Sequence, residues 1–129
     1  VFVFIGKDND NKYKFSKGIY HINGLEQNKV YSCIQQANGL INTSIDEGMA
    51  ISILEAMKLK TPVYVRSNLG NKSIVKHNYN GFIFNSRKEF INLLNKNTEQ
   101  IVKNAYHYVN TFHNTKLEQL KYNKLFPPI

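Results

Sequence analysis

The chain has 129 residues, of which 42% are hydrophobic and 12% aromatic, so it is long enough to form one folded domain with a substantial core. Its formal net charge is +8, but the basic residues are scattered and form no stripe, which favours ordinary surface charge over a nucleic-acid partner. A single cysteine, Cys33, excludes internal disulfides, and no apolar run approaches the roughly 20 residues of a membrane-spanning helix, so we expect a cytoplasmic protein.

Short apolar segments alternate with stretches of helical periodicity along the whole chain. We expect strands at residues 1–6, 18–24, 39–44, 61–67 and 81–85. We expect helices at residues 25–37, about 48–59, from Ser86 onward and 98–125, with a short helical turn after residue 67. Alternating helices and strands that are apolar on both faces predict a three-layer α/β/α, Rossmann-like parallel sheet. Ligands of such sheets bind at the carboxyl ends of the strands.

The segment NTSIDEGMAISILEAM, residues 42–57, carries two carboxylates that an apolar helix does not need. Glu47 precedes the expected helix, Gly48 leads it with backbone N–H groups that can hold phosphate, and Glu55 lies in its middle. If both carboxylates were helical, they would lie about 12 Å apart along the axis. The paired carboxylates of glycoside hydrolases stand only roughly 5 to 9.5 Å apart. The spacing therefore favours an extended ligand, with a nucleoside near one carboxylate and a sugar near the other.

Each carboxylate also has a structural interpretation. Taken alone, Glu47 is better explained as a charge that stabilises a helix N-terminus than as a ligand-binding residue. Glu55 lies among Ile51, Leu54 and Leu59, where burial of its carboxylate without hydrogen-bond partners would be costly. We therefore expect either a solvent-filled ligand groove or a network of polar side chains around it. The four histidines have no metal-ligand spacing, and the sequence contains no nucleophile elbow and no glycine-rich phosphate loop. We therefore expect no metal and no cofactor.

The same residues resemble a known family. The E-x7-E of EGMAISILE, followed by LEAMKLKTPVYV and NYNGFIF, is similar to the signature of the large retaining group 1, or family 4, glycosyltransferases with the GT-B fold. The likeness covers about residues 1–118. It implies that residues 1–129 are a partial C-terminal, nucleotide-sugar-binding domain whose first strand and helix, and whose N-terminal acceptor domain, are absent. A missing first strand would leave a gap in the middle of a sheet with the strand order 3-2-1-4-5-6. A strand from a second copy of the chain could fill that gap, which would give a strand-sharing dimer.

The resemblance also implies a role for each matching position. Glu47 would approach the hydroxyls of the donor sugar as the catalytic carboxylate, and Glu55 would receive the ribose hydroxyls of the nucleotide. The other positions assigned to donor binding are Gly48, Met49 and Ala50 through their backbone N–H groups, Asn23 and Gly24 near the base, and Gly70.

The chain departs from the family pattern in three places. Asn42-Thr43-Ser44 stands where many relatives have Pro-Ser, Gly70-Asn71 replaces a glycine pair, and the usual Glu soon after that pair is missing near Ser73. The basic residues that neutralise the donor diphosphate in the family lie upstream of Val1. Lys7 and Arg66, each just beyond a strand, are the candidates to replace them.

The resemblance implies a glycosyltransferase that moves a sugar from a nucleotide diphosphate to an unknown acceptor, with the retention of configuration that is typical of the family. Because the acceptor domain would be absent, we expect the chain to be inactive on its own. Two alternatives stay open. One is a nucleotide-sugar epimerase or a catalytically silent GT-B relative, which would share the fold but not the transfer. The other is a basic nucleic-acid-binding module that uses the +8 charge, whose affinity would fall steeply with salt.

Overall fold

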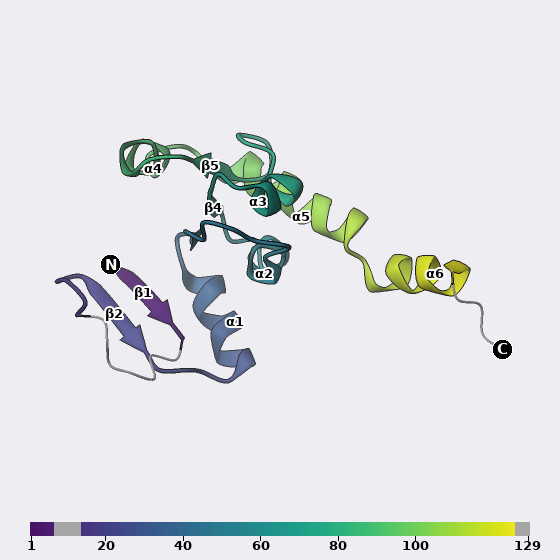
Figure 1. Ribbon diagram of the computed structural model, residues 1–129, viewed down its shortest axis with the longest axis horizontal. Coiled ribbons are helices and arrows are strands. Elements are labelled where there is room, and N and C mark those ends of the chain that lie inside the picture. The colour runs from purple at the N-terminus through teal and green to yellow at the C-terminus, as the bar shows by residue number, and fades with distance from the viewer. Residues whose placement is uncertain (7–13, 126–129) are drawn as a thin grey trace. The chain divides into compact units, whose positions relative to one another are not determined.

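The computed structural model describes residues 1–6 and 14–125 (Figure 1). It divides into two compact units, Val1–Cys33 and Ile34–Ile129. Both units combine helices with parallel strands, so the α/β class predicted from the sequence is confirmed. Within the described residues, no helix is both long and apolar enough to cross a lipid bilayer.

The first unit contains a two-stranded parallel sheet. Strand β1 (Phe2–Ile5) pairs with β2 (Ile19–Ile22), in a register that places Phe4 opposite His21. The His21 ring lies 5.7 Å from the ring of Phe4, and its Nε2 is 2.7 Å from the carbonyl oxygen of Gly6. His21 therefore has a structural role in this sheet. Helix α1 (Gln27–Gln36) begins in this unit and ends in the second.

The second unit is built on a three-stranded parallel sheet in the order β3-β4-β5. Its strands are β3 (Leu40–Asn42), β4 (Val63–Arg66) and β5 (Phe82–Phe84). Its helices are α2 (Ile51–Lys58), α3 (Leu69–Ile74), α4 (Arg87–Leu93), α5 (Glu99–Phe112) and α6 (Thr115–Leu125). The predicted alternation of strand and helix is confirmed from residue 39 onward.

The central strand β4 is buried on both faces. Val63, Tyr64 and Val65 are each at most 4% exposed, and the ring of Tyr64 stacks on that of Phe82 at 5.1 Å. Apolar side chains of α2 and α5 complete the core, among them Ile53, Met57 and Val109. Burial of these side chains is the main favourable term for the sheet, at about 1.5 to 3 kcal/mol for each large one.

The NG pair of the family-like segment NYNGFIF has a packing explanation. Asn80 is fully buried, accepts the N–H of Lys76 at 2.7 Å and donates to the carbonyl oxygen of Ile74 at 3.1 Å. A Cβ at Gly81 would lie 2.6 Å from a methyl carbon of Val63, so only glycine fits between the sheet and the preceding turn. Asn80 and Gly81 therefore stabilise the turn that leads into β5.

Two predicted helix boundaries are wrong. Helix α2 starts at Ile51, not at Gly48, because Ala50 is the N-cap with extended angles of φ −78° and ψ 97°. Residues 48–50 are thus loop, and the axial separation of about 12 Å, which assumed that Glu47 is helical, does not apply. The segment 98–125 is two helices, because the side chain of Asn114 accepts the N–H of Lys116 at 2.9 Å and begins α6.

Candidate functional site

The residues singled out from the sequence lie at the carboxyl edge of the β3-β4-β5 sheet. Asn42 is the last residue of β3 and Arg66 the last of β4, and Asn42 is paired in register with Val65. Because the strands are parallel, the loop that follows β3 and helix α3 that follows β4 start from the same edge. Glu47 lies in the first of these segments and Gly70 in the second.

Asparagine side chains connect the two segments. Asn42 Nδ2 donates to Glu47 Oε1 at 3.2 Å, while Asn42 Oδ1 accepts the N–H of Ser44 at 3.0 Å and the Asn71 amide at 3.3 Å. Asn71 Nδ2 also donates to the carbonyl oxygen of Arg66 at 2.8 Å. The end of β3, the Glu47 loop and the start of α3 are therefore one hydrogen-bonded assembly.

Asn68 adds a second connection to the same loop. It is the N-cap of α3, where its side-chain oxygen accepts the N–H of Asn71 at 2.7 Å. Its amide nitrogen donates to the carbonyl oxygen of Ser44 at 2.9 Å. One side chain thus both begins α3 and attaches it to the loop that carries Glu47.

Gly70 packs directly against that loop. A Cβ built on Gly70 would lie 1.9 Å from the carbonyl oxygen of Glu47 and 2.7 Å from that of Gly48, so no larger residue fits without moving the backbone. Gly48, in contrast, has nothing within 4 Å of its Cβ position. The structure therefore gives Gly70 a packing role beside Glu47. The carbonyl groups of Glu47 and Gly48, which lie against Gly70, belong to the loop that precedes α2.

The surroundings of Glu47 favour its ionised form. Hydrogen bonds from the side chain of Ser44 and then from that of Asn42 hold the pKa of Glu47 below its usual value. The carboxylate is partly exposed at the edge of the sheet. It can therefore accept further hydrogen bonds, for example from hydroxyl groups of a ligand.

Glu55 lies on α2 away from the core. The buried residues of this helix are Ile53, Ala56 and Met57, and around the axis Glu55 is about 160° from Ile53 and Met57 and about 100° from Ala56. Glu55 is partly buried, while Ile51, one turn earlier on its side of the helix, is 64% exposed. The free-energy cost of burying the Glu55 carboxylate is therefore smaller than it would be for a fully buried one.

Apolar side chains surround the Glu47 loop without being buried. Ile45 is 79% exposed, Met49 58% and Leu69, the first residue of α3, 87%. A polar loop bordered by exposed apolar side chains is typical of a surface that contacts a ligand or another protein segment.

The remaining predicted positions lie elsewhere or are not described. Asn23 and Gly24 follow β2 in the first unit, where Gly24 has a φ of +78° that favours glycine. Arg66 ends β4 with an exposed side chain, whereas Lys7 lies outside the described residues. The asparagine network was not among the features predicted from the sequence. Its only sequence signal is the departure from the family pattern at Asn42 and at Asn71.

Two hollows on the second unit do not include Glu47 or Glu55. One, of about 610 Å³, lies beside α4 and is lined in part by His77 and Glu89. Both side chains already have structural partners, because His77 accepts the N–H of Ile83 at 2.9 Å and Glu89 accepts that of Asn85 at 2.8 Å.

The predicted N-cap of α4 at Ser86 is confirmed, because the side-chain oxygen of Ser86 accepts the N–H of Glu89 at 3.2 Å.

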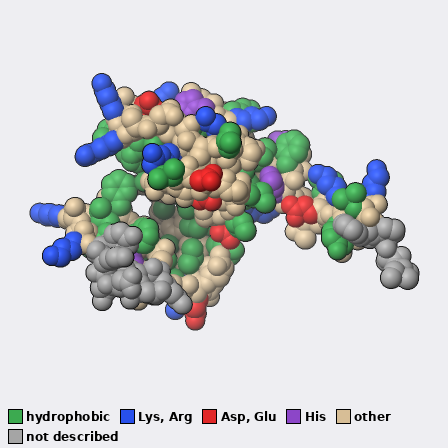
Figure 2. Space-filling view, viewed as in Figure 1, with side chains coloured by type: hydrophobic (Ala, Val, Ile, Leu, Met, Phe, Trp, Pro, Cys, Tyr) green, Lys and Arg blue, Asp and Glu red, His purple; other side chains and the backbone are tan. Residues whose placement is uncertain are grey.

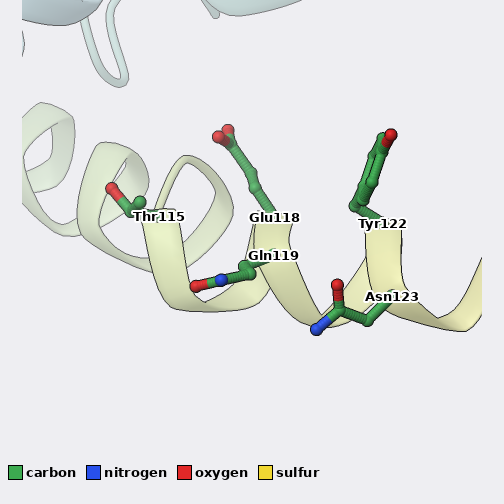
Figure 3. Close-up of a pocket in the computed structure, with 5 residues that line it drawn as sticks. All are labelled: Thr115, Glu118, Gln119, Tyr122 and Asn123. Carbon is green, nitrogen blue, oxygen red and sulfur yellow. The ribbon is translucent and has the colours of Figure 1, made fainter. Parts of the chain in front are cut away.

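The other hollow is the surface of a single helix. Figure 3 shows that all of its lining side chains, among them Glu118 and Tyr122, project from α6. This helix has no buried residue. An open helix surface of this kind does not enclose a small molecule, so we assign it no site.

Basic side chains do not gather at one place on the visible surface. Figure 2 shows Lys and Arg side chains projecting singly or in small groups, separated by uncharged surface. In the part of the chain that the structure describes, no group of three His, Cys, Asp or Glu residues is arranged to hold a metal ion.

Comparison with known proteins identifies the family. A family model described as glycosyl transferases group 1 matches residues 1–116. The chain belongs to this glycosyltransferase family. It is 38% identical over 125 residues to glycosyltransferase 1 domain-containing protein 1 of Xenopus tropicalis, which confirms the likeness seen in the sequence motifs. It is also 30% identical over 113 residues to the Escherichia coli UDP-Gal:alpha-D-GlcNAc-diphosphoundecaprenol alpha-1,3-galactosyltransferase.

Each match covers much of this chain and a minor part of the relative. The two alignments cover 92% and 81% of the chain, but only 36% and 29% of the relatives' lengths. Membership of this glycosyltransferase family favours the predicted transferase over the nucleic-acid-binding alternative.

Solved structures support the predicted Rossmann-like fold. Anabaena HepE in complex with UDP-glucose superimposes with a TM-score of 0.81 at 17% identity, over 95% of this chain and 40% of that one. The C-terminal domain of the group 1 glycosyltransferase LpcC from Francisella tularensis gives a TM-score of 0.65 at 21% identity, over 78% of this chain and 56% of that one. At these identities the likeness establishes the fold alone.

Proposed function

We propose that the chain is the donor-binding part of a glycosyltransferase that moves a sugar from a nucleotide diphosphate sugar to an acceptor. The observation that carries the proposal is the position of Glu47. It is hydrogen-bonded by Asn42 at the carboxyl edge of a parallel sheet, in a chain of the group 1 glycosyltransferase family. UDP-sugars are the first donors to test, because HepE was solved with UDP-glucose and the E. coli relative is named for UDP-Gal.

The proposed roles follow from where each group lies. Glu47 binds hydroxyls of the donor sugar near the reacting carbon, and Glu55, outward on α2, binds the ribose hydroxyls. Backbone N–H groups of residues 48–50 and the exposed Arg66 approach the diphosphate. Catalysis then comes from positioning and from electrostatic stabilisation of the leaving diphosphate, with retention of configuration and without a metal.

The acceptor site is proposed to lie outside residues 1–129, so the chain alone binds the donor without transferring it. We also propose that the protein works in the cytoplasm, on the ground that one cysteine in 129 residues offers no disulfide framework.

A thermal-shift screen of the full-length protein tests the proposal. We expect one class among UDP-, GDP- and ADP-sugars to raise the melting temperature, because a ligand at 100 times its Kd stabilises the native state by about 2.7 kcal/mol. The matching free sugar should give no shift. A shift produced by oligonucleotides and lost with added salt, with none from any nucleotide sugar, would instead support the nucleic-acid-binding alternative.

We further propose a strand-sharing dimer. Among the described residues, β1 pairs only with β2 and β3 only with β4, so each of these strands has an open edge. Unpaired N–H and C=O groups at such edges favour pairing with another strand. Light scattering of the purified chain should give twice the monomer mass of 15.0 kDa. A monomeric mass at all concentrations would contradict strand sharing.

A further inference from the structure

We propose that Asn42 and Asn71 are positioning residues that hold the Glu47 carboxylate in place by linking the ends of β3 and β4. This inference deepens the proposed function, because it concerns how the same site is held ready for a donor. It also makes a physical claim about Glu47 that can be tested without any donor.

Asn71 provides the fixed end of the link. Its side chain is fully buried, and its amide nitrogen donates both to the carbonyl oxygen of Arg66 and to Asn42 Oδ1. A backbone carbonyl can only accept, so the nitrogen of Asn71, not its oxygen, must face Arg66. The remaining atom, Asn71 Oδ1, is buried without a hydrogen-bond partner, so this side chain acts through its donors.

The orientation of Asn42 is fixed in the same way. The N–H of Ser44 can only donate, so Asn42 Oδ1 must face it, and the same oxygen accepts from Asn71. With its oxygen held by two donors, Asn42 has only its amide nitrogen left for Glu47, at 3.2 Å. The carbonyl group of Arg66 thus fixes the orientation of Asn71, and the N–H of Ser44 fixes that of Asn42. Together they determine the direction of every hydrogen bond between Arg66 and Glu47.

This direction has a chemical consequence for Glu47. A side chain that can only donate to the carboxylate favours its ionised form and one of its rotamers. Hydrogen bonds from the side chain of Ser44 and then from that of Asn42 lower the pKa of Glu47, and Asn42 is the one of the two that is linked to β4 through Asn71. Since Asn71 is attached to β4 and Asn42 to β3, the carboxylate is positioned relative to both strand ends at once.

The variant Asn42→Asp removes the donor and keeps the rest of the network. An aspartate at this position can still accept from the N–H of Ser44 and from Asn71, but it presents a negative charge to Glu47 in place of an N–H. We expect the pKa of Glu47, followed by NMR of its side-chain carboxyl carbon in the chain, to rise by about one unit, because a like charge disfavours ionisation. The control Asn95→Asp makes the same charge change at an exposed position after α4 and should leave this pKa unchanged.

Donor binding supplies a readout that a merely structural role would not move. In the full-length protein, Asn42→Asp should weaken UDP-sugar binding about tenfold relative to UDP binding, since only the sugar is proposed to contact Glu47. Asn42→Gln, which retains an amide donor and adds no charge, should restore much of that ratio. If Asn42→Asp does not fold, Asn42→Ala takes its place, because it removes the donor without adding charge.

The outcomes separate the two proposals. A folded Asn42→Asp or Asn42→Ala variant in which Glu47 keeps its pKa would overturn the positioning role. A raised pKa in a protein that binds no nucleotide sugar, with or without the substitution, would support the positioning of Glu47 and contradict the proposed function.

Discussion

Replacing Gly70 by alanine is expected to lower the free energy of unfolding by about 3 kcal/mol, the upper part of the range for overpacked sites. The new methyl carbon would lie 1.9 Å from the carbonyl oxygen of Glu47 and 2.6 Å from its carbonyl carbon. Both are backbone atoms, so no side-chain rotation can relieve the overlap, and the Glu47 loop or α3 must move. Urea unfolding of the chain, followed by circular dichroism, measures the loss.

Gly48→Ala is the matched control for this prediction. It adds the same methyl group to the same contact region, but nothing lies within 4 Å of the Cβ position of Gly48. We therefore expect the free energy of unfolding to change by no more than about 0.5 kcal/mol, the range of ordinary surface substitutions. Equal losses for the two variants would show that Gly70 is not packed against the Glu47 loop.

The Gly70 contact also shows what a local sequence pattern can and cannot predict. The strand positions were predictable because β4 is apolar on both faces, as a central parallel strand must be. The start of α2 was not, because Gly48, Met49 and Ala50 are compatible with a helix by themselves. The carbonyl groups of Glu47 and Gly48 lie instead against Gly70, which is more than 20 residues later, and no local pattern reports such a contact.

The candidate site was predictable to the same limited extent. Its location at the carboxyl edge followed from strand alternation, and Glu47 lies there as predicted. The residues that hold Glu47 were overlooked because Asn42 and Asn71 are 29 residues apart, and asparagine is frequent throughout the chain. A polar network of this kind depends on which side chains the fold brings together, and only the three-dimensional structure contains that information.

Glu47→Gln and Glu55→Gln are expected to impair the proposed activity of the full-length protein in different ways. Both substitutions keep the shape of the side chain, and a glutamine in place of Glu47 can still accept the amide of Asn42. For Glu47→Gln we expect kcat/KM to fall by about 100-fold or more, as when one electrostatic group at a reacting centre is lost, with UDP affinity within about twofold. For Glu55→Gln we expect UDP and UDP-sugar affinities to fall together by about tenfold or more, because hydrogen bonds to a charged group contribute about 1.5 to 3 kcal/mol.

Calorimetric titration with UDP and with a UDP-sugar, together with steady-state kinetics, separates these two patterns. Glu118→Gln on the exposed helix α6 is the control for loss of a carboxylate.

The double variant decides whether the two side chains act at different ends of one ligand. Groups that contact separate parts of a donor and share no partner should show additive losses within about 0.5 kcal/mol. A double variant no worse than Glu47→Gln alone would mean that both carboxylates serve a single step, and the extended donor between them would have to be abandoned.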